Sequence, residues 1–355
     1  MNHLFKPVRI RSVELRNRIV VSPMCQYSSV DGFANNWHLV HLGSRSVGGA
    51  GLVFCEATAI SPEGRISPDD LGIWKDEHIP FLKTITTFIK EHGAAAGIQL
   101  AHAGRKASHL SPWKGRRPAT QAEGGWQTIA PSAIPFKEGD PVPTEMSIEE
   151  IKTAIRHFQD GAKRSLYAGF EIIEIHAAHG YLFNEFMSPL SNQRMDEYGG
   201  SFENRIKFLL QTVTAIREVI PEGLPLFVRI TSTEWVPNGW DENDSVKLAK
   251  ILKEKGVDVI DCSSGGNSHD QQIPVAPLYQ VSFSEKIRKE AGILTGAVGM
   301  ITTAKEAEHI LSSGQADLIL LGRQMLRDPY FALHAAHEFN EEIPWPNQYE
   351  RAQNY

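Results

Sequence analysis

The stretch Phe170-Glu-Ile-Ile-Glu-Ile175, followed by His176-Ala-Ala-His179-Gly180-Tyr181, decides the fold of this chain. Its first six residues are largely apolar and predict a buried strand. A helix is predicted just before it, because Ser147 and Glu150 form a capping box, an apolar stripe follows at helical spacing, and Gly169 ends the pattern. Two imidazoles and a phenol therefore leave the carboxyl end of a strand together.

The same helix and strand pattern recurs along the chain. Seven further buried strands are predicted, over Arg18–Cys25, Gly51–Ala57, Ala96–Leu100, Leu226–Ile230, Val257–Cys262, Ile293–Ala297 and Ala316–Leu321. Further helices are predicted over Phe81–Glu91, Ile206–Ile220, Asp244–Gly256, Phe283–Ala291 and Thr303–Ser313. Apolar strands that alternate with helices are typical of parallel strands covered on both faces. No Gly-x-Gly-x-x-Gly follows an early strand, so the pattern favours a closed (β/α)8 TIM barrel of the α/β class over a doubly wound sheet.

Two stretches fall outside the repeating units. Residues Val8–Leu15 alternate apolar and charged side chains, which predicts a short N-terminal hairpin that caps the barrel. Residues Ser108–Asp140 are rich in glycine, proline and polar side chains, and long loops of this kind in compact proteins are usually functional. Composition does not shift along the chain. We therefore expect residues 1–355 to form a single domain, with residues 335–355 as a C-terminal tail.

Composition excludes several classes of protein. The net charge of −6 and the isoelectric point near 6.2 argue against a dedicated nucleic-acid-binding protein. Three scattered cysteines do not make a disulfide framework and suit a reducing compartment. The N-terminus has no apolar signal segment, and no apolar run approaches the roughly 20 residues of a membrane helix. We expect a cytoplasmic protein that binds neither membranes nor nucleic acids.

In a TIM barrel, the functional side chains lie at the carboxyl ends of the strands. Here those ends carry Ser22–Cys25 with Tyr27, Glu56 and Ala57, Gln99 with His102, the His176 to Tyr181 turn, Arg229, Cys262–Ser264, Gly296–Gly299, and Gly322 with Arg323. Glycine-rich turns after the last two strands match the usual barrel site for a phosphate, because glycine lets backbone N–H groups approach an anion. The alternative is that these glycines only end their strands.

These motifs together resemble the old yellow enzyme family of FMN-dependent ene-reductases, in its cysteine-containing, thermophilic-like branch typified by bacterial NADPH dehydrogenases. The resemblance runs nearly end to end and rests on Asn17–Ile19, Ser22–Tyr27, Glu56–Ala57, Gly64–Ile66, Gly97–Lys106, Ala130–Ala133, His176–Arg205, Gly296–Gly299 and Leu321–Arg323. It implies bound FMN, NADPH or NADH as reductant, and reduction of activated alkenes (enones, enals, maleimides, nitroalkenes) in a ping-pong scheme. It also implies a homodimer or homotetramer.

The resemblance assigns one group of residues to FMN. Arg229 would lie beside flavin N1–C2=O and stabilise the anionic reduced flavin, although a salt bridge to Asp261 is an alternative. Gln99 would pair with the pyrimidine edge of the ring, and the small Ala57 would lie against it. The remaining cofactor contacts would come from Ser22, Pro23, Met24, Cys25, Gly299, Gly322 and Arg323. Cys25 would tune the flavin potential, or would simply be a small buried hydrophobe.

A second group is assigned to the substrate. His176 and His179 are spaced i, i+3, so they point the same way if the chain turns helically after the strand. They would donate hydrogen bonds to the carbonyl or nitro oxygen of the alkene. The alternatives are a structural pair or a zinc site, for which no fitting third ligand is evident. Tyr181 would donate the proton that completes reduction, since a phenol stays protonated at neutral pH, or it would be an interface aromatic. Tyr27, supported by Lys106, would line the substrate pocket.

We predict roles for two further groups of residues, a second histidine pair and the C-terminal tail. His38 and His41 share the same spacing but precede no strand end, so we expect a structural role for them. Tyr349-Glu-Arg351 resembles the tail that, in this branch, sends an arginine into a neighbouring subunit's active site. Arg351 would then contact substrate in trans, although residues 352–355 depart from the family pattern and a frayed terminus is the alternative.

Three other functions compete with the resemblance. A flavin-free barrel lyase or isomerase acting on a sugar phosphate would use the same phosphate site but would need a lysine or carboxylate base at a strand end. A non-catalytic phosphate-binding barrel would leave the His–His–Tyr set without a use. A dienoyl-CoA reductase relative would need a closely spaced cysteine quartet for an iron–sulfur cluster, which three scattered cysteines exclude.

Overall fold

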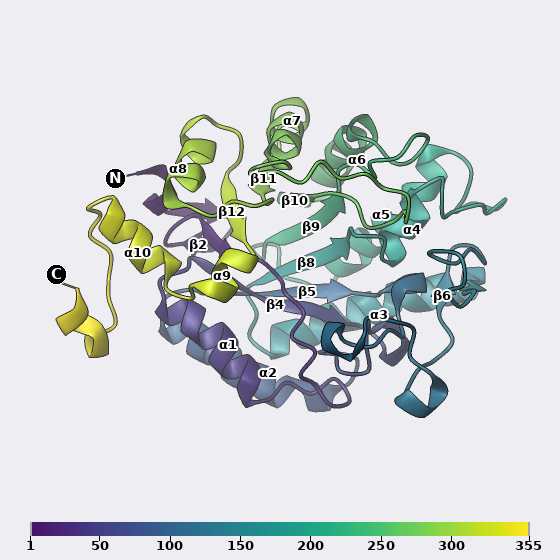
Figure 1. Ribbon diagram of the computed structural model, residues 1–355, viewed down its shortest axis with the longest axis horizontal. Coiled ribbons are helices and arrows are strands. Elements are labelled where there is room, and N and C mark those ends of the chain that lie inside the picture. The colour runs from purple at the N-terminus through teal and green to yellow at the C-terminus, as the bar shows by residue number, and fades with distance from the viewer. Residues whose placement is uncertain (1, 354–355) are drawn as a thin grey trace.

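A computed structural model describes residues 2–353 and shows eight parallel strands closed into a barrel, with helices around it (Figure 1). Around the barrel the strands follow the order β10-β11-β12-β3-β4-β5-β8-β9. The expected (β/α)8 TIM barrel is confirmed. The barrel strands are β3 (Ile19–Val21), β4 (Leu52–Ala59), β5 (Ala95–Ala101), β8 (Ile172–Ala177), β9 (Leu226–Thr231), β10 (Val259–Ser263), β11 (Leu294–Ala297) and β12 (Leu318–Leu321).

Helices form the outer layer and turn their apolar faces toward the strands. In chain order the larger ones are α1 (Asn36–Val47), α2 (Ile79–Glu91), α3 (Ile148–Tyr167), α5 (Phe202–Arg217), α6 (Glu242–Glu254), α7 (Val281–Ala291), α8 (Ala304–Ser312) and α10 (Phe331–Glu338). Two short helices, α4 (Leu182–Met187) and α9 (Arg323–Arg327), follow strand ends. None of the helices between residues 2 and 353 has the length and apolar character needed to cross a membrane.

The barrel interior is filled by side chains that alternate along the strands. Val20, Leu52, Phe54 and Phe227 belong to one buried cluster, while their sequence neighbours pack outward against the helices. Two apolar side chains of the hairpin β1 (Val8–Ile10) and β2 (Val13–Leu15) belong to the same inner cluster. The predicted N-terminal hairpin is therefore confirmed, and it caps the barrel.

The same alternation carries polar side chains to the carboxyl end of the barrel. Arg229 follows the inward-facing Phe227 by two residues and pairs with His176 on β8 and Asp261 on β10, and Ser263 lies two residues beyond Asp261 on the same face. Because parallel strands end on one side of a barrel, these side chains meet there. Because every second side chain of a strand faces the barrel interior, the polar groups of the site face it at the carboxyl end.

Several predicted boundaries differ from the structure. The strand predicted over Arg18–Cys25 is wrong at its end, because β3 stops at Val21 and Ser22–Cys25 run on without strand pairing. Helix α1 was not predicted, since it buries His38, His41 and Arg45 and so lacks a purely apolar stripe. Helix α3 begins as predicted, with the Ser147 side chain accepting the backbone N–H of Glu150.

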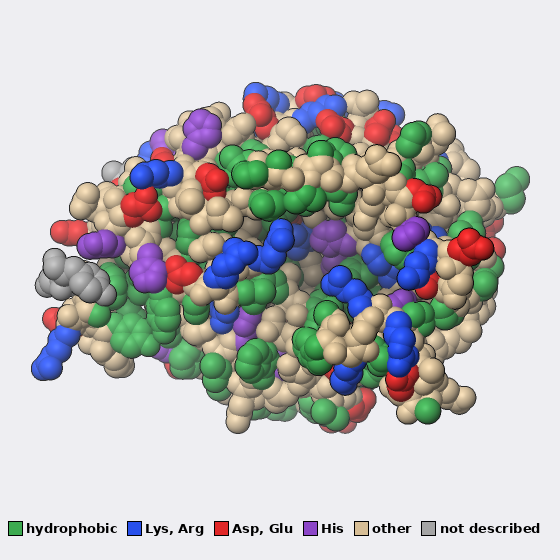
Figure 2. Space-filling model, viewed as in Figure 1, with side chains coloured by type: hydrophobic (Ala, Val, Ile, Leu, Met, Phe, Trp, Pro, Cys, Tyr) green, Lys and Arg blue, Asp and Glu red, His purple; other side chains and the backbone are tan. Residues whose placement is uncertain are grey.

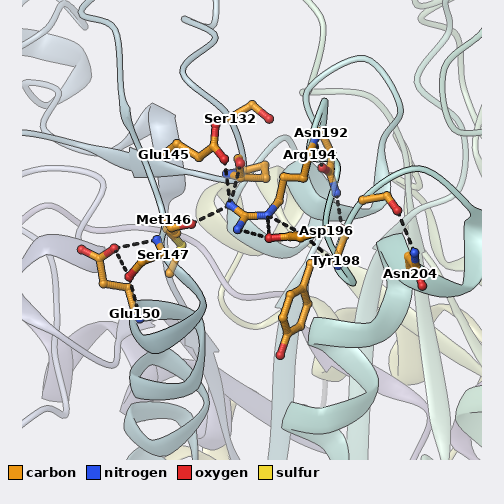
Figure 3. A network of polar contacts seen from close by, with 12 residues as sticks. Ser132, Glu145, Met146, Ser147, Glu150, Asn192, Arg194, Asp196, Tyr198 and Asn204 are labelled. Atoms are coloured by element: carbon orange, nitrogen blue, oxygen red, sulfur yellow. Dashed lines mark hydrogen bonds and ion pairs between the residues drawn. The ribbon is translucent and has the colours of Figure 1, made fainter.

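The long loop between β5 and α3 contains three 3₁₀ turns (Gly104–Lys106, Pro112–Lys114 and Gln121–Glu123) and a small parallel pair, β6 (Ile129–Ala130) with β7 (Thr144–Glu145). Figure 3 shows the buried guanidinium of Arg194 that ties this loop to the segment after Tyr181. Arg194 donates to the backbone oxygens of Pro131 (2.9 Å) and Met146 (2.6 Å) and pairs with Asp196 at 2.6 Å.

Replacing Arg194 with methionine is expected to lower the free energy of unfolding by about 3 kcal/mol, because two buried carbonyl oxygens lose their donor and Asp196 loses its partner. Urea denaturation checks this value. The matched control is Arg9→Met, which removes an exposed ion pair to Glu14 and should cost less than about 1 kcal/mol. Equal effects of the two substitutions would contradict an anchoring role for Arg194.

Candidate functional site at the carboxyl end of the barrel

The glycine-rich turns after β11 and β12 border a cavity of about 210 Å³. Its lining includes Gly299, Gly322 and three arginines, Arg229, Arg323 and Arg327, and contains no carboxylate. Gly299 has a backbone φ of +123°, which a residue with a side chain rarely adopts. Figure 2 shows lysine and arginine side chains gathered around a hollow with a histidine at its bottom. A cavity with this donor set suits a phosphate group.

Arg229 has a carboxylate partner within the barrel. Its Nε lies 3.1 Å from Oδ2 of Asp261, and its Nη1 donates to the hydroxyl of Ser22 at 3.2 Å. The alternative considered for Arg229, an ion pair with Asp261, is therefore present. Burial raises the pKa of Asp261 to about 6, and the guanidinium opposes that rise. Arg229 also lines the 210 Å³ cavity, so the ion pair does not remove it from the site.

Gln99 is held in place by a buried carboxyl group. Its amide nitrogen donates to Oε1 of Glu174 at 2.8 Å, and both side chains are fully buried. Burial raises the pKa of Glu174 well above its usual range, and the neighbouring Asp261 adds to this rise. With the amide nitrogen fixed, the Gln99 oxygen accepts no hydrogen bond from residues 2–353. Ala57 lies opposite Gln99 in the β4–β5 pairing, and its side chain is only a methyl group.

His176 and His179 lie together, but not through a helical turn. The backbone of His179 is left-handed, with φ of +62°, and α4 begins only at Leu182. The helical explanation of their spacing is therefore wrong, although His179 Nδ1 lies 3.4 Å from His176 Nε2. No group of three potential metal-ligating side chains occurs within residues 2–353, so the pair has no third ligand there.

Hydrogen bonds to the outer nitrogens of the His176 and His179 rings determine which nitrogen of each ring carries the proton. The backbone N–H of Ala178 donates to His176 Nδ1 at 3.3 Å, so the neutral His176 ring carries its proton on Nε2. Ser263 Oγ lies 2.6 Å from His179 Nε2. When this hydroxyl donates, His179 carries its proton on Nδ1, which lies 3.4 Å from the protonated Nε2 of His176. Burial, with the nearby Arg229, lowers the pKa of both imidazoles well below 6.5, which keeps them neutral.

Tyr181 stands beside the histidines. Its ring lies 4.9 Å from that of His176, edge to face. Burial raises the pKa of the Tyr181 phenol well above 10, so the hydroxyl keeps its proton. The ammonium group of Lys106 lies 5.3 Å from the Tyr181 ring and donates to the backbone oxygens of His179 and Gly266. Lys106 thus holds the turn that carries His179.

A second cavity of about 390 Å³ lies on the Tyr181 side, between that residue and the long loop. It is lined by Tyr27 and Lys106, as expected for a substrate pocket, and by loop residues from His109 to Asp140. Burial raises the pKa of Tyr27, so this cavity presents two protonated phenols.

The predicted cofactor contacts Ser22, Pro23, Met24 and Cys25 follow β3 at the same end of the barrel. Cys25 is partly buried there, and burial raises the pKa of its thiol well above 9.

Arg351 does not join the site of its own chain, because its 3₁₀ turn (Asn347–Ala352) is exposed and packs near α10. His38 lies 3.2 Å from Glu56 in the interior, a contact that is consistent with the structural role predicted for it. Residues 354–355 of the predicted tail lie outside the described residues.

Sequence reasoning missed several members of the site. Glu174 was treated as part of an apolar run, although it lies two residues before His176 and therefore on the same face of β8. Ser263 was named only as a strand end, and its contact with His179 joins residues that are 84 positions apart. Nothing in the sequence marked Arg327 or Arg116 as a site residue, because neither α9 nor the folded form of the long loop was predicted.

Comparisons with known proteins identify a family and several related flavin enzymes. Residues 3–342 match the model of the NADH:flavin oxidoreductase / NADH oxidase family. The chain is 51% identical over 350 residues, 98% of both chains, to an NADPH dehydrogenase of Geobacillus thermodenitrificans. A structure of morphinone reductase in complex with tetrahydroNAD is 26% identical, with a TM-score of 0.77, over 98% of this chain and 93% of that chain. A structure of the old yellow enzyme homologue from Zymomonas mobilis is 25% identical, with a TM-score of 0.77, over 96% and 94% of the two chains.

Proposed function

Because this chain belongs to the NADH:flavin oxidoreductase / NADH oxidase family, in its bacterial old yellow enzyme branch, we propose that it reduces activated alkenes with electrons from NAD(P)H. It is an FMN-dependent oxidoreductase. The observation that carries the proposal is the convergence of two neutral imidazoles and a protonated phenol beside a cavity suited to a phosphate. Enones, enals, maleimides and nitroalkenes carry, conjugated to an electron-poor double bond, a carbonyl or nitro oxygen that such a set of donors would bind.

The described residues fit FMN from end to end. Arg323 and Arg327, with Gly299 and Gly322, would hold the phosphate in the 210 Å³ cavity. The free oxygen of Gln99 would accept from the pyrimidine edge of the ring, and Arg229 would stabilise negative charge there. Ser22 to Cys25 and Ala57 would contact the rest of the cofactor. When bound there, the cofactor would supply hydride transfer, from NAD(P)H to the β-carbon of the alkene.

The substrate side is served by the imidazoles and the phenol. His176 and His179 would donate hydrogen bonds to the carbonyl or nitro oxygen and would stabilise the negative charge that develops on it. Tyr181 would give its proton to the α-carbon on the opposite face, and Tyr27 would border the bound alkene. Since reductant and alkene would use one pocket in turn, we expect ping-pong kinetics.

A lyase or isomerase would need a free lysine or carboxylate as its base, and the candidate bases near this site are engaged by other groups. Lys106 is the lysine beside the histidines, and its ammonium group is occupied by two backbone oxygens. The carboxyl groups of Glu174 and Asp261 lie deep in the barrel with pKa values raised by burial, and their partners are Gln99 and Arg229. The site therefore favours hydrogen-bond donation over proton abstraction.

Assembly and location belong to the same proposal. We infer that residues 1–355 act as one FMN-binding domain, in a homodimer or homotetramer in which Arg351 reaches the active site of a neighbouring subunit. The exposure of Arg351 in its own chain supports this role. The three cysteines are free, which suits the reducing cytoplasm.

An anaerobic titration tests the proposed function. The purified protein is expected to show flavin absorbance, which NADPH should bleach and 2-cyclohexenone should then restore. A protein that shows no such absorbance, and gains none when FMN is added, would rule the proposal out. Bleaching without reoxidation by any activated alkene would leave a flavin oxidoreductase with a different acceptor.

A further inference from the structure

The tip of the long loop is held over the cavity beside Tyr181. The backbone N–H of Leu110 donates to the oxygen of Arg117 at 2.8 Å, which closes the tip on itself. Trp113 packs edge to face against Tyr27, with ring centroids 5.7 Å apart. The loop therefore contributes a defined wall to the 390 Å³ cavity.

This tip carries three cations, and two of them have carboxylate partners. Lys114 donates to Asp69 at 2.8 Å, and Arg117 makes two hydrogen bonds to Glu123, at 2.6 and 2.9 Å. Arg116 lines the cavity instead, and its guanidinium has no ion pair or hydrogen bond within residues 2–353. Its charge opposes the rise that burial causes in the pKa of both Tyr27 and Tyr181, which line the same cavity.

The cavity as a whole is electropositive. Lys106, Arg116 and Lys137 line it, and the carboxylate among its lining residues is Asp140. Asp140 lies 3.9 Å from Lys137, so those two charges offset one another. Lys106 is engaged by two backbone oxygens and adds charge rather than a free donor. Among these three cations, Arg116 is thus the one whose side chain has neither an ion pair nor a hydrogen bond within residues 2–353.

We propose that Arg116 forms a subsite for a carboxylate carried by the alkene substrate. This inference rests on the proposed function and adds the substrate class to it. The electron-poor end of the molecule would lie at His176, His179 and Tyr181, and its carboxylate at the far wall of the cavity. A guanidinium binds a carboxylate through two parallel hydrogen bonds, so the subsite would favour such acids over their neutral analogues.

The test uses the holoenzyme and a matched pair of alkenes: a cyclohex-2-enone with a three-carbon carboxyalkyl chain at ring carbon 5, and its methyl ester. We expect kcat/KM for the acid to exceed that for the ester by about tenfold. Arg116→Gln should remove this preference by lowering the value for the acid and leave the ester within about twofold. Arg117→Gln, which changes the charge of the same tip equally, should keep the preference. Added salt should weaken it.

Three results would overturn the inference. Equal kcat/KM for acid and ester in the unmodified enzyme would remove the subsite. An equal loss on both alkenes in Arg116→Gln would give the residue a structural role. A loss confined to the reduction of the flavin by NADPH would assign Arg116 to the phosphates of the reductant. Unsubstituted 2-cyclohexenone separates these results from failure of the proposed function, because it tests reoxidation without the carboxylate.

Discussion

Replacing Tyr181 with phenylalanine is expected to slow reoxidation of the reduced enzyme by 2-cyclohexenone by about 100-fold. General acids contribute about 100-fold to 10,000-fold to a rate, and the lower value applies because the second phenol, Tyr27, lines the same cavity. Reduction of the flavin by NADPH needs no proton from Tyr181 and should change little. Stopped-flow measurement of the two half-reactions separates these effects.

Tyr27→Phe is the matched control, since it removes a phenol from the same cavity without removing the one that contacts His176. It should weaken the binding of the alkene more than it slows the proton transfer. The double variant should be slower than Tyr181→Phe alone if Tyr27 provides the residual proton. A loss of equal size in both half-reactions would show that Tyr181 supports the structure of the site and is not its acid.

Replacing His176 with alanine is expected to lower kcat/KM for the alkene by about 100- to 1,000-fold, the usual cost of removing one donor to a developing oxyanion. His179→Ala should fall in the same range. The double variant should lose little more than either one, because the two N–H groups act on one oxygen. His179→Asn keeps an N–H donor and should recover part of the rate.

The pH dependence provides a second readout for this pair. Burial lowers the pKa of both imidazoles well below 6.5, so neither should gain a proton between pH 8 and pH 6, and the rate should not change there because of them. A step in the unmodified enzyme near pH 6.5 that is absent from the alanine variants would contradict the neutral pair. Flavin absorbance confirms that each variant still holds FMN.

Local sequence patterns were sufficient to predict the barrel. Apolar runs, capping signals such as Ser147 with Glu150, and the alternation in Val8–Leu15 depend on neighbours in the chain, so they could be detected without any contact between distant residues. Helix α1 shows the limit of such patterns. It buries His38 and His41, whose burial depends on tertiary partners such as Glu56 and not on a stripe of apolar side chains.

The sequence by itself determined which polar side chains gather at the carboxyl ends of the strands, because parallel strands must present these ends on one side of a barrel. Only the tertiary structure decided how those groups are held. The left-handed turn at His179, the contact between His179 and Ser263, and the support of Gln99 by Glu174 each join parts of the chain whose approach no local pattern encodes. Arg116 likewise lines the cavity from a left-handed backbone position (φ +50°), while its neighbours Lys114 and Arg117 pair with carboxylates elsewhere.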